Sequence, residues 1–452
     1  MAKARTAAPS YRCGECGWTA TKWQGRCGEC QAWGTLEQAG APRLREVAAG
    51  PVTSPAVPIG EVSVLTAAAV PSGVDELDRV LGGGLVPGSV VLLAGEPGVG
   101  KSTLLLEVAA RHATGQRRAL YVTGEESAAQ VRIRAERIGS VSPDLFLAAE
   151  TDLAAVLGHV EAVGPGLLIV DSVQTVGTLD VEGAPGGVTQ VKEVAAALIR
   201  AAKARDMATI LVGHVTKDGS VAGPRTLEHL VDVVLHVEGD RHGRLRMVRA
   251  LKNRYGPADE VGCFELAEDG IWGMPDPSGL FLTARQHPAP GSCVTVTLEG
   301  TRPLLAEVQA LVVASSAPSP RRQTSGLDSS RVAMVSAVLD KHGLLVSARA
   351  DTYVATVGGV RITEPAADLA IALALGSSHS ETPVHPRLIA FGEVGLSGEI
   401  RRVTGTERRL SEAARMGFTH ALVPAGSGPG PDGLVVREVA LVSDAFDLLH
   451  QR

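Results

Sequence analysis

A glycine-rich loop set between an apolar run and a helical run restricts the possible folds of this 452-residue chain more than any other feature. Its spacing, G-x-x-x-x-G-K-[ST], is that of a phosphate-binding loop, whose glycines let backbone N–H groups close round phosphate oxygens. Lys101 would neutralise the β- and γ-phosphates of ATP, and Ser102 would ligate Mg²⁺. The predicted nucleotide site consists of Gly95, Glu96, Pro97, Gly98, Val99, Gly100, Lys101, Ser102 and Thr103.

The surroundings of this loop predict a mostly parallel sheet wrapped by helices. Short runs of Val, Leu and Ile alternate with helical stretches, as expected for strands buried on both faces. Two later runs are joined by the short turn 238–244 and are therefore expected to be antiparallel. The fold class is α/β, with parallel strands at 90–93, 119–122, 167–170 and 210–212, extended by a hairpin of 231–237 and 245–251.

Three carboxylates follow predicted strands at the edge that carries the loop. Asp171 ends the run 167–170, where a carboxylate would hold Mg²⁺ directly or through water, although an ordinary strand-end Asp is the alternative. Glu125 and Glu126 follow the neighbouring run, and one of them is placed to polarise the attacking water. A favourable interaction with a helix dipole accounts for the other.

Four cysteines near the start form two Cys-x-x-Cys pairs, a spacing that can wrap four thiolates round one Zn²⁺. A pair of disulfides or a redox-active dithiol is the alternative, which the six Cys in 452 residues make less suitable. A segment this short cannot bury a core, so the metal would hold it folded. The predicted zinc ligands are Cys13, Cys16, Cys27 and Cys30.

The same segment holds Trp18, Trp23 and Trp33, three of the four Trp in the chain. These rings could stack on nucleic-acid bases or on a partner. Packing round the cysteine turns is the interpretation that we favour from the sequence.

Composition leaves the class of partner open. A net charge of −6 does not exclude a polyanionic ligand, because binding depends on where Lys and Arg cluster. No apolar run approaches the length of a membrane span, and the ends carry no targeting signal, so we expect a soluble cytoplasmic protein.

Two further segments give the chain a family resemblance. They are Leu211-Val-Gly-His-Val-Thr-Lys-Asp-Gly219 and the pentapeptide Lys252-Asn253-Arg254-Tyr255-Gly256. With the zinc motif and the phosphate-binding loop, they resemble the bacterial RadA (Sms) family of DNA repair proteins over essentially the whole length. The family usually has Phe where Tyr255 stands, which keeps the ring. The resemblance implies a RecA-like ATPase core, with Glu125 as the catalytic glutamate and His214 as the sensor of the γ-phosphate.

The pentapeptide belongs to a basic stretch with six cations in fourteen residues. Two functional interpretations stay open, contacts to DNA phosphates or contacts to ATP in a neighbouring subunit. A solvated basic surface is the third. The resemblance implies that the pentapeptide couples ATP to work on DNA. The cations are Arg241, Arg244, Arg246, Arg249, Lys252 and Arg254.

The last part of the chain resembles the protease domain of Lon, through segments 358–370 and 392–398. Lon proteases use a Ser nucleophile that a Lys activates. Ala366 and Glu407 stand at the matching positions, so peptide hydrolysis by this dyad is not expected. The likeness implies a hexameric ring. Four arginines here could meet DNA phosphates or form a solvated edge: Arg401, Arg402, Arg408 and Arg409.

Together these features predict a four-Cys zinc finger at 1–37, an Ala-, Pro- and Gly-rich linker at 38–64, a RecA-like ATPase domain at 65–285 and a Lon-protease-like α+β domain at 286–452. The expected function is that of a DNA-dependent ATPase in repair, a ring motor on single-stranded and branched DNA that promotes branch migration. A RecA-type recombinase or the replicative helicase machinery would be its partner. An ATP-gated scaffold that binds proteins without moving on DNA is the alternative.

Overall fold

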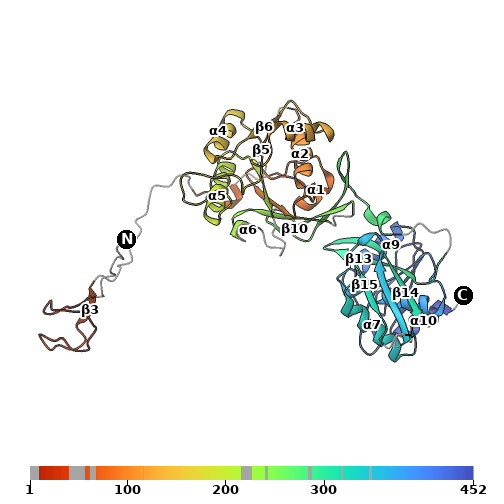
Figure 1. Ribbon diagram of the computed structural model, residues 1–452. Coiled ribbons are helices and arrows are strands. Elements are labelled where there is room, and N and C mark those ends of the chain that lie inside the picture. The colour runs from red at the N-terminus through yellow and green to blue at the C-terminus, as the bar shows by residue number, and fades with distance from the viewer. Residues whose placement is uncertain are drawn as a thin grey trace. The chain divides into compact units, whose positions relative to one another are not determined.

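The computed structural model describes residues 10–39, 56–61, 68–115, 117–214, 226–239, 243–282, 288–316, 319–345 and 349–450. These fall into two compact units, Met1–Ser63 and Val64–Arg452 (Figure 1). Most of the predicted linker 38–64 lies outside the described residues, as do Arg241 and residues 215–219 of the family segment 211–219.

The N-terminal unit is built on a three-stranded antiparallel sheet in the order β2-β1-β3. The apolar residues buried in its described part are Cys13, Cys27 and Leu36. Such a core is too small to hold a fold without a staple. The elements are β1 (Ser10–Cys13), β2 (Thr19–Ala20), β3 (Leu36–Ala39) and the 3-10 turn η1 (Ile59–Glu61).

The second unit begins with a nine-stranded sheet in the order β12-β11-β10-β9-β4-β8-β7-β5-β6. Strands β9, β4, β8, β7, β5 and β6 run parallel, and β9 to β12 pair antiparallel. The predicted parallel sheet with an antiparallel hairpin is therefore confirmed. The strands are β4 (Val90–Gly95), β5 (Ala119–Thr123), β6 (Leu145–Ala149), β7 (Leu167–Asp171), β8 (Ala208–His214), β9 (Val233–Glu238), β10 (Leu245–Asn253), β11 (Val261–Ala267) and β12 (Gly270–Gly273).

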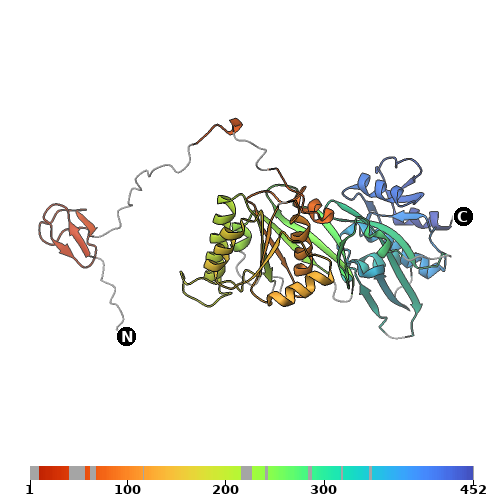
Figure 2. The same ribbon diagram turned by 90° about the horizontal axis from the view of Figure 1, so that it is seen from above.

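Helices cover both faces of this sheet (Figure 2). Alternate residues of β4 enter opposite cores: Val91 and Leu93 pack with α1 and α2, whereas Val90 and Leu92 pack with α4 and α5. Burial on both faces explains why the parallel strands are continuously apolar. The helices are α1 (Asp75–Leu81), α2 (Lys101–His112), α3 (Ala128–Arg137), α4 (Leu153–Val163), α5 (Val188–Ala204) and α6 (Thr226–Leu230).

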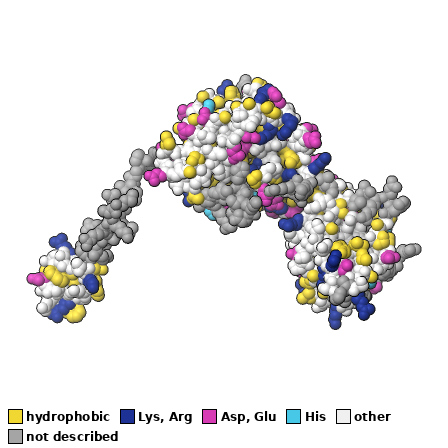
Figure 3. All heavy atoms as spheres, viewed as in Figure 1, with side chains coloured by type: hydrophobic (Ala, Val, Ile, Leu, Met, Phe, Trp, Pro, Cys, Tyr) yellow, Lys and Arg dark blue, Asp and Glu magenta, His cyan; other side chains and the backbone are white. Residues whose placement is uncertain are grey.

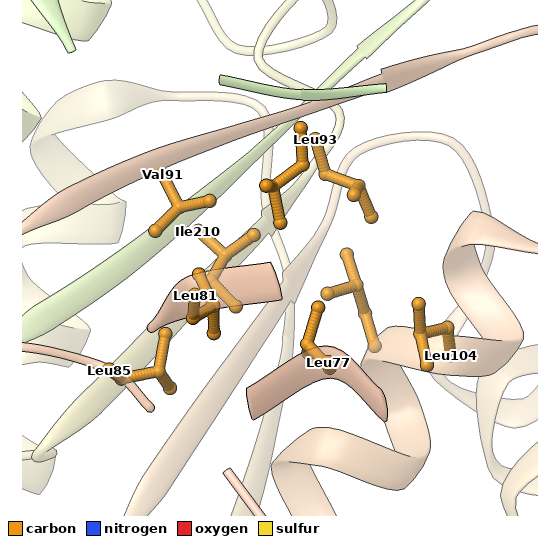
Figure 4. A pocket seen from close by; sticks show the side chains of 9 residues that line it. Leu77, Leu81, Leu85, Val91, Leu93, Leu104 and Ile210 are labelled. Carbon is orange, nitrogen blue, oxygen red and sulfur yellow. The ribbon is translucent and has the colours of Figure 1, made fainter. Parts of the chain in front are cut away.

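The core beneath α1 contains a small hollow of about 10 Å³, shown in Figure 4. Its lining comes from α1, α2 and the central strands and is wholly apolar, with Leu77, Leu93 and Leu104 among the side chains. A space of this size without polar partners is a packing defect, since even one ordered water needs hydrogen bonds.

A seven-stranded sheet in the order β15-β16-β14-β13-β17-β20-β21 forms the rest of the second unit. Helix α8 is buried almost all round, which suits its run of Ala, Leu and Ile. The elements are η3 (Pro277–Leu280), β13 (Ser292–Glu299), β14 (Arg302–Ala314), β15 (Arg322–Ser325), α7 (Ser329–Lys341), β16 (Ala350–Thr356), η5 (Val357–Gly359), η6 (Pro365–Ala367), α8 (Asp368–Ser380), β17 (Leu388–Ala390), β18 (Glu393–Val394), β19 (Ile400–Arg401), α9 (Thr406–Arg415), β20 (His420–Pro424), β21 (Val435–Val439) and α10 (Val442–His450).

A buried ion pair joins the two sheets of this unit. The guanidinium of Arg302, on β14, pairs with Glu76 of α1, and both side chains are almost wholly buried. Arg302 also donates to the carbonyls of Met274 and Pro275, and Glu76 accepts from the Cys263 backbone N–H at 2.9 Å. Every charge in this contact is therefore paired, as a buried charge requires.

The helices in the described part of the chain include none that is long and apolar enough to cross a membrane.

Candidate nucleotide site and zinc centre

The phosphate-binding loop connects β4 to α2, as the sequence predicted. Gly98 and Gly100 adopt φ values of 79° and 105°, which only glycine reaches without strain. A Cβ on Gly95 would lie 2.7 Å from the Val237 carbonyl oxygen, so β9 packs directly against the start of the loop. The first N–H groups of α2 have no partner within the helix and form a ready anion site.

A cleft of about 500 Å³ opens above this loop, a size that suits a nucleotide. The loop supplies one side of it, together with Glu125. The remaining lining comes from α3 and from the β11–β12 turn, which sequence reasoning did not assign to the site: Arg134, Arg137, Ile138, Leu266, Ala267, Glu268 and Gly270.

Lys101 lies at the floor of the cleft and is 5% exposed. Its Nζ donates to the carbonyls of Gly95 at 2.8 Å and Glu96 at 2.9 Å. Burial lowers the pKa of Lys101, and the nearby carboxylates of Asp171 and Glu125 partly oppose that shift. The fold thus brings together three of the predicted residues from β7, the β5–α3 loop and the phosphate-binding loop.

Asp171 ends β7 and is held by a tyrosine that the sequence did not single out. The buried Tyr121 hydroxyl, on β5, donates to Asp171 Oδ2 at 2.6 Å. Burial, followed by the Asp171 carboxylate, raises the pKa of Tyr121 well above its usual value, while the Ser102 hydroxyl acts against the shift. Ser102, Asp171 and Tyr121 therefore meet at one point, where hydroxyl and carboxylate oxygens fit the ligand preference of Mg²⁺.

The two glutamates after β5 have different surroundings. Glu125 lines the cleft and accepts a hydrogen bond from Ser172 Oγ at 2.7 Å. Glu126 forms an ion pair with Arg134 and stands next to Ser127, the N-cap of α3. Glu126 therefore has an ion-pair partner at the start of α3, as expected for the glutamate of the pair that interacts with the helix dipole.

His214 is the last residue of β8. In the parallel register its Cα lies opposite Gly95 of β4, so its backbone is next to the start of the phosphate-binding loop. Its side chain lies outside what the structure describes.

The four predicted zinc ligands converge in the N-terminal unit. Their sulfur atoms all lie within 4.8 Å of one another, with Cys13 and Cys30 Sγ 3.7 Å apart and Cys16 and Cys27 Sγ 3.6 Å apart. A tetrahedron with Zn–S bonds of about 2.3 Å has sulfur separations of about 3.8 Å. The thiolates thus fit Zn²⁺, which would hold this coreless unit folded.

The two cysteine turns repeat one backbone pattern. The N–H of Cys13 donates to the Trp18 carbonyl at 2.8 Å, and that of Cys27 donates to the Ala32 carbonyl at 2.9 Å. The Thr35 hydroxyl lies 3.2 Å from Cys13 Sγ and is the main cause that lowers the pKa of Cys13 to about 6. Thr35 is thus an outer partner of a ligand, of the kind that fixes ligand orientation.

Polar side chains of the pentapeptide at the end of β10 form hydrogen bonds within the chain. Lys252 Nζ donates to the carbonyls of Glu228 and Val231, both at 2.8 Å. Burial, with a contribution from Arg254, lowers the pKa of Lys252. The Asn253 carboxamide closes the following turn by accepting from the N–H groups of Tyr255 and Gly256.

Arg254 is paired with Asp232 at 3.1 Å and stays half exposed, and the Tyr255 ring is 45% exposed. Gly256 lies very close to Gly82: a Cβ added to Gly256 would be 3.0 Å from the Cα of Gly82. The segment is therefore a structured turn with Arg254 and Tyr255 at its surface.

Two arginines of the basic stretch have structural roles that correct the expectation of free cations. Arg246 is 5% exposed, and its Nε donates to the Val99 carbonyl in the phosphate-binding loop at 3.1 Å. Arg249 pairs with Glu299 at 2.6 Å and lies near Glu238. Carboxylates and carbonyls of the same chain satisfy these cations, because β10 lies in the interior of the sheet.

The Lon-like region requires a second correction. Arg409, predicted either to meet DNA phosphates or to lie on a solvated edge, is fully buried and pairs with Glu364 through bonds of 2.8 and 2.6 Å. Its exposure was misjudged because helix α9 turns this side chain inward, whereas Arg401, Arg402 and Arg408 are exposed. Ala366 is buried in η6, and Glu407 is exposed in the first turn of α9.

Three family models match separate parts of this chain. The family model "AAA domain" matches residues 58–220, "Rubredoxin metal binding domain" matches 11–38, and "Subunit ChlI of Mg-chelatase" matches 354–427. The DNA repair protein RadA of Mycobacterium tuberculosis is 57% identical over 442 residues, which cover 96% of this chain and 91% of that protein. This chain belongs to the RadA family.

Other RadA proteins are similar over comparable lengths. The one from Mycolicibacterium smegmatis is 56% identical, covering 94% of this chain and 93% of its own. The one from Streptococcus pyogenes serotype M1 is 44% identical, covering 97% and 98%. The predicted family and fold class are thereby confirmed, with a zinc ribbon, an AAA-type ATPase domain and a C-terminal ChlI-like, Lon-like domain.

Sequence reasoning missed several residues of the RadA site described above. Tyr121 gave no signal because its strand reads as uniformly apolar, and Ser172 gave none because a serine after a strand is common. The burial of Arg246 could not be predicted either, since charge alone does not reveal burial.

Proposed function

We propose that this chain is a DNA-dependent ATPase that processes recombination intermediates in DNA repair. In this proposal it works as a ring motor on single-stranded DNA and promotes branch migration. The observation that carries the proposal is that Lys101, Ser102 and Glu125 line one nucleotide-sized cleft, with the Asp171 carboxylate close to Lys101 and hydrogen-bonded to Tyr121. The 57% identity to a DNA repair protein supports the biological setting.

The chemical step follows from the positions of these side chains. Loop N–H groups and Lys101 would bind the β- and γ-phosphates, and Ser102 and Asp171 would hold Mg²⁺, which supplies charge neutralisation when bound. Glu125, oriented by Ser172, would accept a proton from water while the water oxygen bonds to the γ-phosphorus. The bond from that phosphorus to the β–γ bridging oxygen then breaks, giving ADP and phosphate.

Strand β10 offers a route from ATP to the pentapeptide. Near its start Arg246 holds the Val99 carbonyl of the phosphate-binding loop, and at its end Lys252 and Asn253 anchor the surface turn. The intervening residues span roughly 20 Å at about 3.3 Å per residue. A change in the loop on ATP binding would thus reach Arg254 and Tyr255 through one rigid element, with either DNA or the ATP of a neighbouring subunit as the target.

One observation favours the alternative of a protein-binding scaffold. Lys252, Arg246 and Arg249 are bonded within the chain, so this stretch offers fewer cations to DNA than its composition indicates. We further propose that the Lon-like domain has no protease activity, because Ala366 carries no nucleophile and Glu407 no amine.

The test is the steady-state ATPase rate with and without single-stranded DNA across a salt series. Lys101→Ala and Glu125→Gln should abolish hydrolysis. Glu126→Gln is the matched control for Glu125→Gln and should retain most of the ATPase rate. Stimulation by DNA that weakens with salt and is lost in Arg254→Ala supports the motor. A rate that DNA does not change at any salt supports the scaffold, and full activity in Lys101→Ala contradicts the assigned site.

A further inference from the structure

The three tryptophans of the zinc unit have separate roles. Trp18 is half buried and covers the second cysteine turn, since a Cβ on Gly28 would lie 2.8 Å from its ring. The prediction that tryptophans pack round the turns is confirmed for Trp18. It is wrong for Trp23 and Trp33, which are 62% and 74% exposed.

Trp23 and Trp33 lie side by side. A Cβ on Gly25 would be 3.7 Å from the Trp33 ring and 3.9 Å from the Trp23 ring, so both indoles flank one glycine. We call this pair of indoles, Trp23 and Trp33, the strip. Its backbone is joined to the second cysteine turn, because Arg26 and Trp33 form an antiparallel bridge and the Gly34 N–H donates to the Gly25 carbonyl at 2.9 Å.

Arg26 fixes the strip and gives it charge. Its guanidinium lies 5.7 Å from the centre of the Trp33 ring and donates to the Gln31 carbonyl at 2.9 Å and side chain at 2.7 Å. Lys22 precedes Trp23 and is also exposed. Figure 3 shows hydrophobic and basic side chains, together with an acidic one, on the visible face of this unit.

We propose that Trp23 and Trp33, with Arg26 and Lys22, form a stacking site for the bases of single-stranded DNA. Two exposed indoles provide flat faces on which successive bases stack without regard to sequence. The two cations suit the phosphates that accompany those bases, so the occupant that complements the strip is a polyanion with aromatic rings. The inference rests on the proposed DNA-dependent function and assigns the zinc unit a direct part in it.

The fluorescence of the full-length chain reports on this site. Trp272→Phe removes the one tryptophan outside the zinc unit, leaving only Trp18, Trp23 and Trp33 to emit. Single-stranded oligothymidylate should quench this emission, and an abasic oligomer of equal length should not. Anisotropy of labelled DNA should show about tenfold weaker binding after Trp33→Ala or Trp23→Ala, with zinc content unchanged.

Each result has one meaning. DNA binding without quenching, or equal quenching by the abasic oligomer, overturns the stacking site and leaves the proposed function intact. Unchanged affinity in both alanine variants also overturns it. If no form of the chain binds DNA and DNA does not stimulate its ATPase, the proposed function fails with it.

Discussion

At the scale of single residues, the proposed Mg²⁺ position involves a side chain outside every motif. Tyr121 is buried and donates to Asp171. Burial, followed by the Asp171 carboxylate, raises the pKa of Tyr121, while the Ser102 hydroxyl acts against that shift. Such an outer partner fixes the carboxylate orientation that a Mg²⁺ ligand needs. We therefore expect Tyr121 to act as a positioning residue.

Tyr121→Phe should raise the Mg²⁺ concentration for half-maximal ATPase activity by about tenfold, because Asp171 loses its orienting bond. The measurement is a Mg²⁺ titration at saturating ATP. Tyr255→Phe, at an exposed ring, is the control and should leave the curve in place. An unshifted curve for Tyr121→Phe would show that Asp171 is oriented without it.

His112 gives the fold a predictable sensitivity to acid. It is 5% exposed at the end of α2, and its Nδ1 has no hydrogen-bond partner among the residues that the structure describes. Burial, with a smaller effect of Arg117, lowers the pKa of His112 to about 4. The unfolded chain takes up this proton near pH 6.5, whereas the folded chain resists it down to about pH 4.

This residue should therefore reduce stability progressively as the pH falls from about 6.5 to about 4. The urea midpoint should drop between pH 7 and pH 5, and His112→Leu should lessen that drop. His159→Gln, at a more exposed position, is the matched variant and should retain the full drop. Equal drops in all three proteins would mean that other groups dominate the acid response.

At the scale of elements, a glycine-to-alanine substitution inside a helix can raise or lower the stability of the chain, depending on what surrounds the glycine. Gly158 in α4 is exposed, and a Cβ there would meet no atom of the described residues within 4 Å. Gly376 in α8 is buried, and a Cβ there would lie 1.9 Å from the Phe446 ring of α10. Both glycines are helical, so they share the same intrinsic cost relative to alanine.

Gly158→Ala should stabilise the chain by about 0.5–1 kcal/mol, since it gains helix propensity at no steric cost. Gly376→Ala should destabilise it by about 1–3 kcal/mol through overpacking against Phe446. Thermal unfolding of the two variants measures both effects. A stabilising Gly376→Ala would mean that α10 moves aside without loss.

At the scale of the whole molecule, the pair Glu76–Arg302 links the ATPase sheet to the Lon-like sheet. All its charges are buried and satisfied by the two sheets together. Removing one member leaves the other charge buried without compensation, which costs far more than removing both.

Glu76→Gln should therefore lower stability by about 3–5 kcal/mol, and the double variant with Arg302→Met by distinctly less than the sum of the two single effects. A double-mutant cycle on the unfolding free energy tests this. Limited proteolysis in the connection 274–291 should also become faster in Glu76→Gln. Strict additivity would show that the pair contributes no coupling between the sheets.

Local patterns in the sequence predicted much of this molecule. The phosphate-binding loop, the strand runs, the Cys-x-x-Cys turns and the ends of β5 and β7 are all set by neighbouring residues. Parallel strands place their carboxyl ends at one sheet edge, so Asp171, Glu125 and the loop had to meet there. The zinc ligands were equally readable, because each turn fixes two sulfurs through local backbone geometry.

Only the tertiary structure decided which polar groups are buried and what they contact. Arg246, Arg249 and Arg409 read as available cations, yet strand pairing and helix packing enclose them with oxygen partners. Tyr121 read as one more core residue, and Trp23 and Trp33 read as packing rings. Charge and apolarity belong to the residue and are written in the sequence, whereas exposure and partner depend on segments far apart in the chain and exist only once it is folded.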